Sequence, residues 1–180
     1  GFVHPDKFWK NYGAQTGDKL ILTKPLGAGI INTAIKADLV SERAREAVLK
    51  SMKTLNKYAC EILKKYTIHA CTDITGFGLG GHGTEMAAGS DKTLVIDSQA
   101  LLIPGGAYRN REFAAKTGYV STAKLWLEDL VFDPQTSGGL LAAVPAEEAD
   151  EILRELKESS LPCAVIGEVI DREKHTLLIR

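Results

Sequence analysis

Cysteine is scarce in this 180-residue chain, which contains only Cys60, Cys71 and Cys163. The number is odd and no Cys-x-x-Cys pair occurs, so we expect no disulfide framework and predict a reducing, cytoplasmic location. None of the three has both a base and a cationic group beside it in the sequence, so none is a candidate nucleophile. Each is expected to be a small buried apolar side chain.

Long apolar runs and an excess of either charge are also missing. The longest apolar run, Leu140–Val144, is too short to span a bilayer, and Gly1–Lys10 has no apolar core of a signal peptide. Lys plus Arg number 22 against 23 for Asp plus Glu, a balance that argues against nucleic-acid binding. No P-loop and no Gly-x-Ser-x-Gly motif occurs. With 44% hydrophobic residues the chain can still bury a core.

The order of the elements predicts an α+β fold, a mixed sheet with packed helices. Residues 1–18 are loop-like and are interpreted as a connector from a missing N-terminal domain, whereas residues 19–180 form the domain. Apolar patterns predict strands at residues 19–23, 68–71, 93–97 and 140–144. Helical spacing predicts one long helix over residues 41–65, capped by Ser41, and shorter helices over 82–88, 108–116 and 145–159. Residues 164–170 and 176–179 are expected to pair as a hairpin about Asp171–Lys174.

A glycine-rich turn, Thr72–His82, gives the strongest chemical signal in the sequence. Glycines allow close approach of the backbone to a ligand, and a helix start supplies amides for an anion. Asp73 at the mouth of the turn would repel phosphate unless a cation lies between them, and Mg²⁺ suits that place. The candidate nucleotide ligands of this turn are Thr72, Thr75, Gly76 and Gly78. The alternative is an ordinary strand-to-helix turn in which Asp73 bonds nearby amides.

Two other interpretations of the same region are weaker. Gly76, Gly78 and Gly81 fit a Gly-x-Gly-x-x-Gly dinucleotide motif with Asp97 at the ribose, but the preceding strand is polar rather than apolar. His69, Cys71 and Asp73 share one strand face, yet neighbours on that face lie roughly 6.6 Å apart along the strand and rarely converge on one zinc ion. The four histidines are therefore expected in the core or on the surface.

A second turn, Asp133–Gly139, is rich in hydroxyl and amide groups. Thr136, Ser137 and Gly138 are candidate anion ligands, and the alternative is a tight turn before a strand. Arg109 and Arg111 carry guanidinium groups that suit phosphate, although an exposed basic pair is more often only solvated.

Three segments together carry a family resemblance. Leu22–Gly27, Thr72–His82 and Asp133–Leu141, in that order, closely resemble the selenophosphate synthetase family, and Gly1–Asp6 and Tyr108–Asn110 resemble further segments of it. The resemblance extends over essentially the whole chain. It implies an enzyme of two α/β domains, related to aminoimidazole ribonucleotide synthetase, of which this chain is the C-terminal one.

The resemblance also implies a reaction. ATP, selenide and water become selenophosphate, AMP and phosphate, with Mg²⁺, in an enzyme expected to be a homodimer. Asp73 matches the acidic residue that this domain contributes to the magnesium–phosphate cluster. The family's Cys or Sec nucleophile, its lysine and most nucleotide contacts belong to the absent domain, so this chain alone is expected to be inactive. Gly80 stands where the family commonly has a larger apolar residue, which is expected to loosen the turn without affecting Asp73.

Two alternatives remain open at this point. One alternative is a non-catalytic binding module that kept the fold. The other is part of a sister ATP-dependent synthetase or kinase. The Asp133–Gly139 turn is expected to differ in such a sister enzyme.

Overall fold

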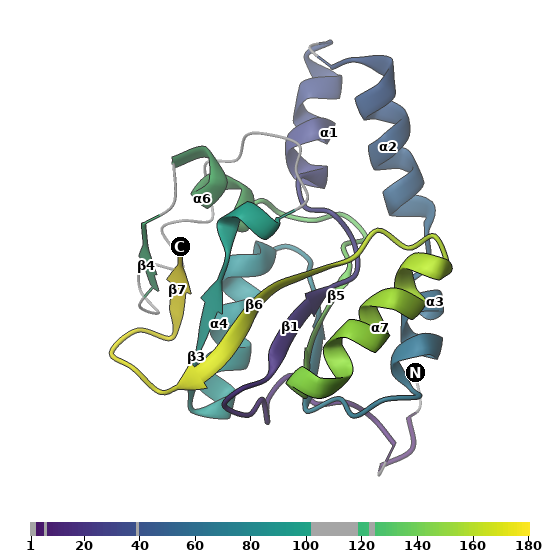
Figure 1. The fold of residues 1–180 in the computed structure, drawn as a ribbon. Helices are drawn as coiled ribbons and strands as arrows, with labels where there is room; N and C mark the ends of the chain where they lie inside the picture. Colours follow the sequence, from purple (N-terminus) through teal and green to yellow (C-terminus); the bar gives the residue numbers. More distant parts are fainter. Residues whose placement is uncertain (1–2, 6, 39, 102–118, 123–124) are drawn as a thin grey trace.

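A mixed sheet forms the centre of the molecule, as predicted, and the described residues supply seven strands to it (Figure 1). The computed structural model describes residues 3–5, 7–38, 40–101, 119–122 and 125–180. Its strands are β1 (Lys19–Leu22), β2 (Ala70–Asp73), β3 (Lys92–Ile96), β4 (Tyr119–Ser121), β5 (Leu140–Val144), β6 (Ala164–Asp171) and β7 (Leu177–Ile179), in the spatial order β2-β5-β1-β6-β3-β7-β4. The helices are α1 (Ala28–Lys36), α2 (Glu42–Lys53), α3 (Asn56–Leu63), α4 (Gly78–Ser90), α6 (Leu125–Val131) and α7 (Ala146–Glu158), with a 3₁₀ turn η1 at Ser98–Ala100.

The pairing directions bring several strand ends to one edge. Strand β5 is antiparallel to both β2 and β1, and β6 is antiparallel to both β1 and β3. Strand β7 is parallel to β3, and β4 is parallel to β7. The carboxyl ends of β1, β2, β3, β7 and β4 therefore share one edge with the amino ends of β5 and β6. We call this the carboxyl edge of the sheet.

Helices cover the sheet on both faces. Helix α4 and the end of α6 pack on one face, where Met86, Leu94 and Phe132 belong to the larger hydrophobic core. Helices α3 and α7 cover the other face, with Leu63 and Ile152 in a second core. Figure 1 shows α7 in front of the sheet and α4 behind it.

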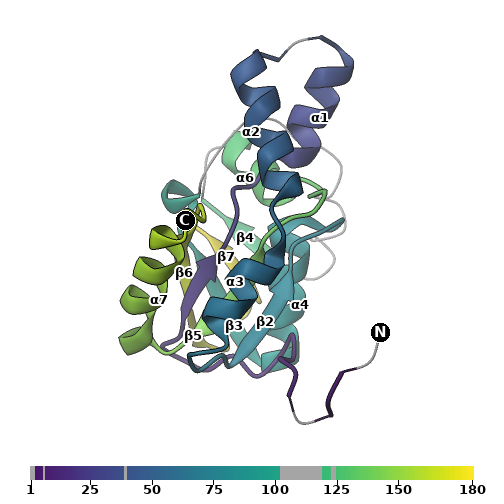
Figure 2. The ribbon, with the colours of Figure 1, turned by 90° about the vertical axis from the view of Figure 1, so that its right-hand side faces the viewer.

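Helices α1 and α2 form a hairpin that projects from the carboxyl edge (Figure 2). Its own small core contains Ala28, Ile31 and Val48. The hairpin begins after Gly27, whose φ of 104° is a left-handed conformation that glycine adopts without strain. The hairpin is thus joined to the rest of the domain by two short connections, residues 23–27 from β1 and residues 54–55 to α3.

The predicted single helix over residues 41–65 is wrong, because it is interrupted at Thr54 and Leu55. Both residues are extended, with ψ of 120° and 139°. Helix α2 packs against α1 in the hairpin, whereas α3 packs on the sheet, so one straight helix does not satisfy both contacts. The predicted cap is confirmed, since Ser41 Oγ accepts a hydrogen bond from the amide of Ala44 at 3.3 Å.

The predicted hairpin of residues 164–170 and 176–179 is also wrong. Strands β6 and β7 do not pair with each other, because β3 lies between them and β7 runs parallel to β3.

The helix expected at 82–88 begins earlier, at Gly78. The sequence prediction missed α1, α6 and β4, and the helix expected at 108–116 lies outside the described residues. Within the described part of the chain, no helix has the length and apolar character needed to cross a membrane.

Residues of the expected connector lie against the domain. The Lys10 carbonyl accepts a hydrogen bond from the amide of Cys71 on the edge strand β2 at 2.8 Å, and the amide of Gly17 donates to Val169 at 2.9 Å. The division into a connector, residues 1–18, and a domain, residues 19–180, stays a prediction.

Candidate functional site at the carboxyl edge

The three segments that carried the family resemblance meet at the carboxyl edge. In the sheet, Asp73 of β2 pairs with Leu140 of β5, and Leu22 of β1 pairs with Leu141. Beyond the strands, the amide of Ile74 donates to the carbonyl of Gly139 at 2.8 Å. Segments more than 100 residues apart at their extremes are therefore side by side here, with the glycine-rich turn next to the Asp133–Gly139 turn.

Asp73 is the last residue of β2, and its side chain is exposed. The Thr72 hydroxyl donates a hydrogen bond to the backbone carbonyl of Asp73 at 3.3 Å rather than to its carboxylate. Within the described residues, no hydrogen bond or ion pair to the Asp73 carboxylate is found. The carboxylate is thus not engaged with neighbouring amides there, and its oxygens are accessible to a cation from solvent.

Thr75 is fixed through both its backbone and its side chain. Its carbonyl accepts hydrogen bonds from the amides of Gly78 and Gln135, each at 3.0 Å. Its hydroxyl lies 3.0 Å from Nε2 of His82. The next residue, Gly76, is exposed, and a side chain there would meet no atom within 4 Å. The turn is therefore firmly held on one side and open on the other.

Buried glycines of this turn allow close packing of α4. A Cβ atom at Gly78, whose φ is 67°, would lie 2.8 Å from the carbonyl oxygens of Val131 and Asp133. A Cβ atom at Gly80 would overlap the ring of Phe132. The expectation that Gly80 loosens the turn is therefore wrong, because the Phe132 ring fills the space beside it.

Asp133 and Gln135 cap the first turn of α1 from within the protein. The Asp133 carboxylate, only 1% exposed, accepts hydrogen bonds from the amide of Gly29 at 3.0 Å and from Gln135 Nε2 at 2.8 Å. Gln135 Oε1 accepts from the amides of Gly27 and Ala28 at 3.1 and 3.2 Å. Burial raises the pKa of Asp133 to about 6, although these hydrogen bonds act in the opposite direction. The backbone amides at the start of α1 thus already have hydrogen-bond acceptors within the protein.

Two of the three remaining candidates of the second turn, Ser137 and Gly138, also have internal partners. Ser137, at a φ of 54°, donates from Oγ to the carbonyl of Met52 at 2.9 Å, and Gly138 accepts at its carbonyl from Asn56 Nδ2, also at 2.9 Å. Thr136 is exposed. These contacts join the turn to the connection between α2 and α3, and binding of a nucleotide by Thr136, Ser137 or Gly138 stays a prediction.

Lys24 is a buried cation that the sequence prediction missed. It is 3% exposed, and its Nζ donates hydrogen bonds to the carbonyl oxygens of Thr54 at 2.7 Å and Ser137 at 2.8 Å. Burial lowers the pKa of its ammonium group. The one sequence feature that could have pointed to it is its place directly before Pro25, just after an apolar strand.

The weaker metal and dinucleotide interpretations gain no support from the described residues. His69 Nδ1 lies 2.8 Å from the buried carboxylate of Asp18, and burial, with the nearby Cys60 and Asp73, raises the pKa of Cys71 to about 12. No group of three or more metal-binding His, Cys, Asp or Glu side chains occurs in the described part of the chain. Asp97 instead accepts from the amide of Gln99 at 2.9 Å and caps η1.

The three cysteines are free thiols, with Cys71 and Cys163 buried and Cys60 partly buried. The prediction of no disulfide framework is confirmed for them. Arg109 and Arg111, the predicted phosphate-binding pair, lie outside the described residues.

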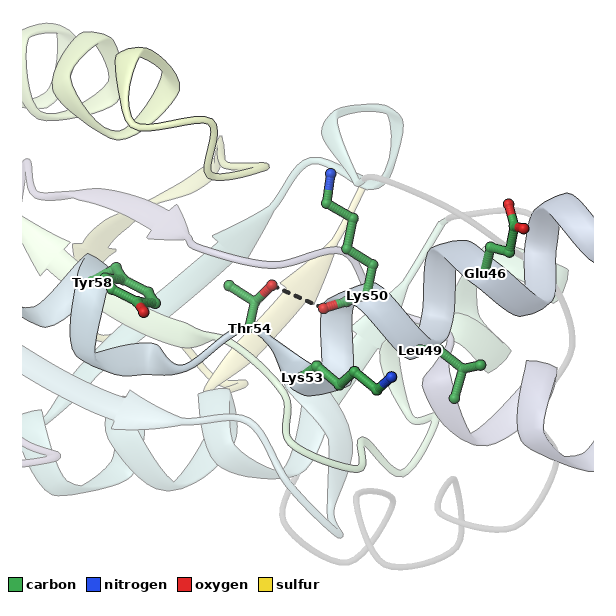
Figure 3. A pocket seen from close by; sticks show the side chains of 6 residues that line it. All are labelled: Glu46, Leu49, Lys50, Lys53, Thr54 and Tyr58. Atoms are coloured by element: carbon green, nitrogen blue, oxygen red, sulfur yellow. Dashed lines mark hydrogen bonds between the residues drawn. The ribbon is translucent and has the colours of Figure 1, made fainter.

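A hollow in the surface lies where α2 meets α3 (Figure 3). Its lining residues are Glu46, Leu49, Lys50, Lys53, Thr54 and Tyr58. The Thr54 hydroxyl donates to the carbonyl of Lys50 at 2.8 Å. The ammonium groups of Lys50 and Lys53 point in different directions. In most ligand sites a few polar groups converge on one point, and those of this hollow do not.

The chain belongs to the family described as "AIR synthase related protein, C-terminal domain", which matches residues 15–180. It is similar along its whole length to proteins named "Selenide, water dikinase". The protein from Desulfitobacterium hafniense strain Y51 is 43% identical over 192 residues, which are 100% of this chain and 56% of that protein. The protein from Pelobacter propionicus is 43% identical over 194 residues, with 99% and 56% covered. The chain thus spans about half the length of these relatives.

Solved structures support the fold. A thiamine-monophosphate kinase from Stenotrophomonas maltophilia superposes with a TM-score of 0.72 at 17% identity, over 98% of this chain and 54% of that one. HypE from E. coli, described as a hydrogenase maturation protein, gives a TM-score of 0.69 at 22% identity, over 99% and 51%. Identities this low establish the shared fold alone.

Proposed function

We propose that this chain is the C-terminal half of an ATP-dependent selenophosphate synthetase. The whole enzyme converts ATP, selenide and water into selenophosphate, AMP and phosphate. The relatives at 43% identity that are named selenide, water dikinase support this assignment over a sister kinase, because the kinase and HypE neighbours share only 17–22%. The Asp133–Gly139 turn, with its buried Asp133 and Gln135, belongs to the same resemblance.

The exposed carboxylate of Asp73 is the observation that carries the proposal. It stands at the open side of a turn whose backbone is fixed by Gln135 and Gly78, and its oxygens suit a hard cation. Mg²⁺ takes only one or two protein carboxylates and completes its shell with water and phosphate oxygens, so a single aspartate from this half is a fitting contribution. When bound, the ion neutralises charge on the phosphate groups of ATP.

The chain's own part in the reaction is to hold that carboxylate and the neighbouring Thr72, Thr75 and Gly76 against the nucleotide. Gly78 is buried and its amide donates to the Thr75 carbonyl, so it supports the turn from within. The nucleophile, its lysine and most nucleotide contacts come from the N-terminal half. The same proposal includes a homodimer formed largely through that half, and a cytoplasmic enzyme.

The test uses the full-length protein and measures AMP formation that depends on ATP, selenide and Mg²⁺. Asp73→Asn is expected to lower the rate at limiting Mg²⁺ by about 100-fold or more, as for other groups that stabilise transition-state charge, with the melting temperature nearly unchanged. The isolated 180-residue chain is expected to have negligible activity.

Asp97→Asn is the matched control, because Asp97 follows β3 at the same edge and an asparagine still caps η1. It is expected to leave the Mg²⁺ requirement unchanged. An Asp73→Asn enzyme with wild-type AMP formation at limiting Mg²⁺ would refute the assignment of the metal carboxylate. A full-length wild type without activity would favour the non-catalytic binding module.

A further inference from the structure

Gln135 connects the glycine-rich turn to the start of α1. Its backbone amide donates a hydrogen bond to the carbonyl of Thr75 at 3.0 Å. Its buried side chain makes the contacts with α1, where Oε1 accepts from the amides of Gly27 and Ala28 at 3.1 and 3.2 Å. One residue therefore joins the turn that carries the candidate metal carboxylate to the base of the α1–α2 hairpin.

The side-chain amide of Gln135 is itself held on its other side. Its Nε2 donates to the backbone carbonyl of Asp133 at 2.9 Å and to Oδ2 of the same residue at 2.8 Å. The amide thus donates twice and accepts twice, which is its full hydrogen-bonding capacity. A buried side chain with all its hydrogen bonds satisfied holds one conformation, and it fixes the backbone of the second turn with it.

The position of Asp73 depends on the backbone on either side of it, because no hydrogen bond or ion pair holds its carboxylate within the described residues. Before it, strand β2 pairs with β5. After it, the amide of Ile74 donates to the carbonyl of Gly139 at 2.8 Å, and the carbonyl of Thr75 accepts from Gln135. Both of these later contacts come from the second turn, so whatever fixes that turn also fixes Asp73.

The two turns are packed backbone against backbone. A Cβ atom at Gly138 would overlap the carbonyl oxygen of Ile74, and one at Gly78 would lie 2.8 Å from the carbonyl oxygen of Asp133. Close-packed groups leave no free volume to absorb a shift. A displacement of the second turn is therefore passed on to the glycine-rich turn.

We propose that Gln135 is a positioning residue for Asp73. Its side chain fixes the second turn on the start of α1, and the Gln135 amide and the Gly139 carbonyl transmit that position to the glycine-rich turn. The inference rests on the proposed function and deepens it. By reciprocity, a ligand that holds Asp73 in place also stabilises the base of the α1–α2 hairpin. Removal of outer groups that orient a metal ligand typically changes metal affinity or activity by 10–100-fold.

The first test is hydrogen exchange of the 180-residue chain and needs no activity. Gln135→Met keeps most of the volume but removes the four side-chain hydrogen bonds. Exchange at the amides of Ile74 and Gly78 is expected to be about tenfold faster or more, relative to the amides of β6 that report on global unfolding. Faster exchange at Gly27 and Ala28 alone would overturn the proposal, because Gln135 would then only cap α1.

The second test measures the Mg²⁺ concentration for half-maximal AMP formation by the full-length protein. Gln135→Met is expected to raise it about tenfold, with a smaller effect on the rate at saturating Mg²⁺. The exchange variant Asp133→Asn/Gln135→Glu is expected to restore it, because the carboxylate introduced at position 135 still accepts from α1 and the amide introduced at position 133 donates to it. A folded Gln135→Met enzyme with a wild-type Mg²⁺ requirement would contradict the inference. Gln135→Asn, one methylene shorter, takes the place of Gln135→Met in both tests if the methionine variant does not fold.

Ser41→Ala is the matched control. Ser41 caps α2 at the far end of the same hairpin, where its Oγ accepts from the amide of Ala44. This variant is expected to lower the melting temperature without changing the Mg²⁺ requirement or the exchange at Ile74 and Gly78. If it raises the Mg²⁺ requirement as much as Gln135→Met does, any loosening of the hairpin suffices and the inference fails while the proposed function stands. A wild type without AMP formation defeats the proposed function itself, and the exchange experiment still decides whether Gln135 holds the Asp73 turn.

Discussion

The carboxylate of Asp133 accepts a hydrogen bond from the backbone amide of Gly29, 3.0 Å away in the first turn of α1. The positive end of a helix dipole favours the ionised form of an acid, whereas burial disfavours it. Burial prevails here, since the pKa of Asp133 is raised to about 6 from its ordinary value of 3.8. The acid therefore caps α1 at a cost in stability whenever it is ionised.

Asp133→Asn is predicted to change how stability depends on pH. Because the folded chain binds this proton more tightly than the unfolded one, the contribution of Asp133 to stability is fully present below pH 3.8 and is lost as pH rises through about 6. A shift of about two pKa units corresponds to roughly 3 kcal/mol at most. Asparagine keeps an acceptor for Gly29 and does not titrate, so its stability relative to the wild type should rise between pH 4 and 6.5.

Urea denaturation of both proteins at several pH values from 4 to 7 measures this difference. Other acids titrate in both proteins and cancel in the comparison. Two stability curves that run parallel over the whole pH range would contradict the raised pKa of Asp133.

The contact between Gly80 and Phe132 predicts a size exchange. Gly80→Leu should overpack the core against the Phe132 ring and cost roughly 1–3 kcal/mol. Phe132→Ala should leave a cavity and cost roughly 3–5 kcal/mol. In the Phe132→Ala protein, however, Gly80→Leu should be stabilising, because the leucine fills the space that the ring leaves.

A double-mutant cycle by denaturant unfolding measures the coupling between the two positions. Strictly additive losses would show that the two positions do not share that space. The exchange would also explain how this chain tolerates glycine where the resembling family commonly has a larger apolar residue.

Local sequence signals predicted those elements whose ends are marked within the sequence itself. The strand predicted at residues 140–144 matches β5, because its apolar run is bounded by Gly139 and Pro145. The helix predicted from Pro145 matches α7 closely for the same reason. The break between α2 and α3 has no such mark, since Leu55 continues the apolar spacing. The break arises because α2 packs against α1 whereas α3 packs against α7, which lies far along the chain.

The candidate site was predictable in part. The glycines that follow Asp73 predicted its place at the mouth of a turn between a strand and a helix, whereas its exposure was known only from the structure. The packing of Gly78 and Gly80 against residues 131–133 did not, because a missing Cβ serves close packing and ligand approach equally well, and sequence alone does not distinguish them. The cap of α1 by Asp133 and Gln135 depends on residues more than 100 positions away.

Lys24 is predicted to hold the α1–α2 hairpin to the sheet. Its ammonium group bonds the carbonyl of Thr54, just after α2, and that of Ser137, so one buried cation joins the hairpin to the second turn. Lys24→Met keeps most of the volume but leaves these carbonyls without their donor, at a cost of about 2–3 kcal/mol. Hydrogen exchange should rise first at the amides that follow Thr54. Lys53→Met, on an exposed part of α2, should change stability by less than about 0.5 kcal/mol. A Lys24→Met protein with wild-type exchange at this connection would show that the packing of α2 on α1 suffices to hold the hairpin.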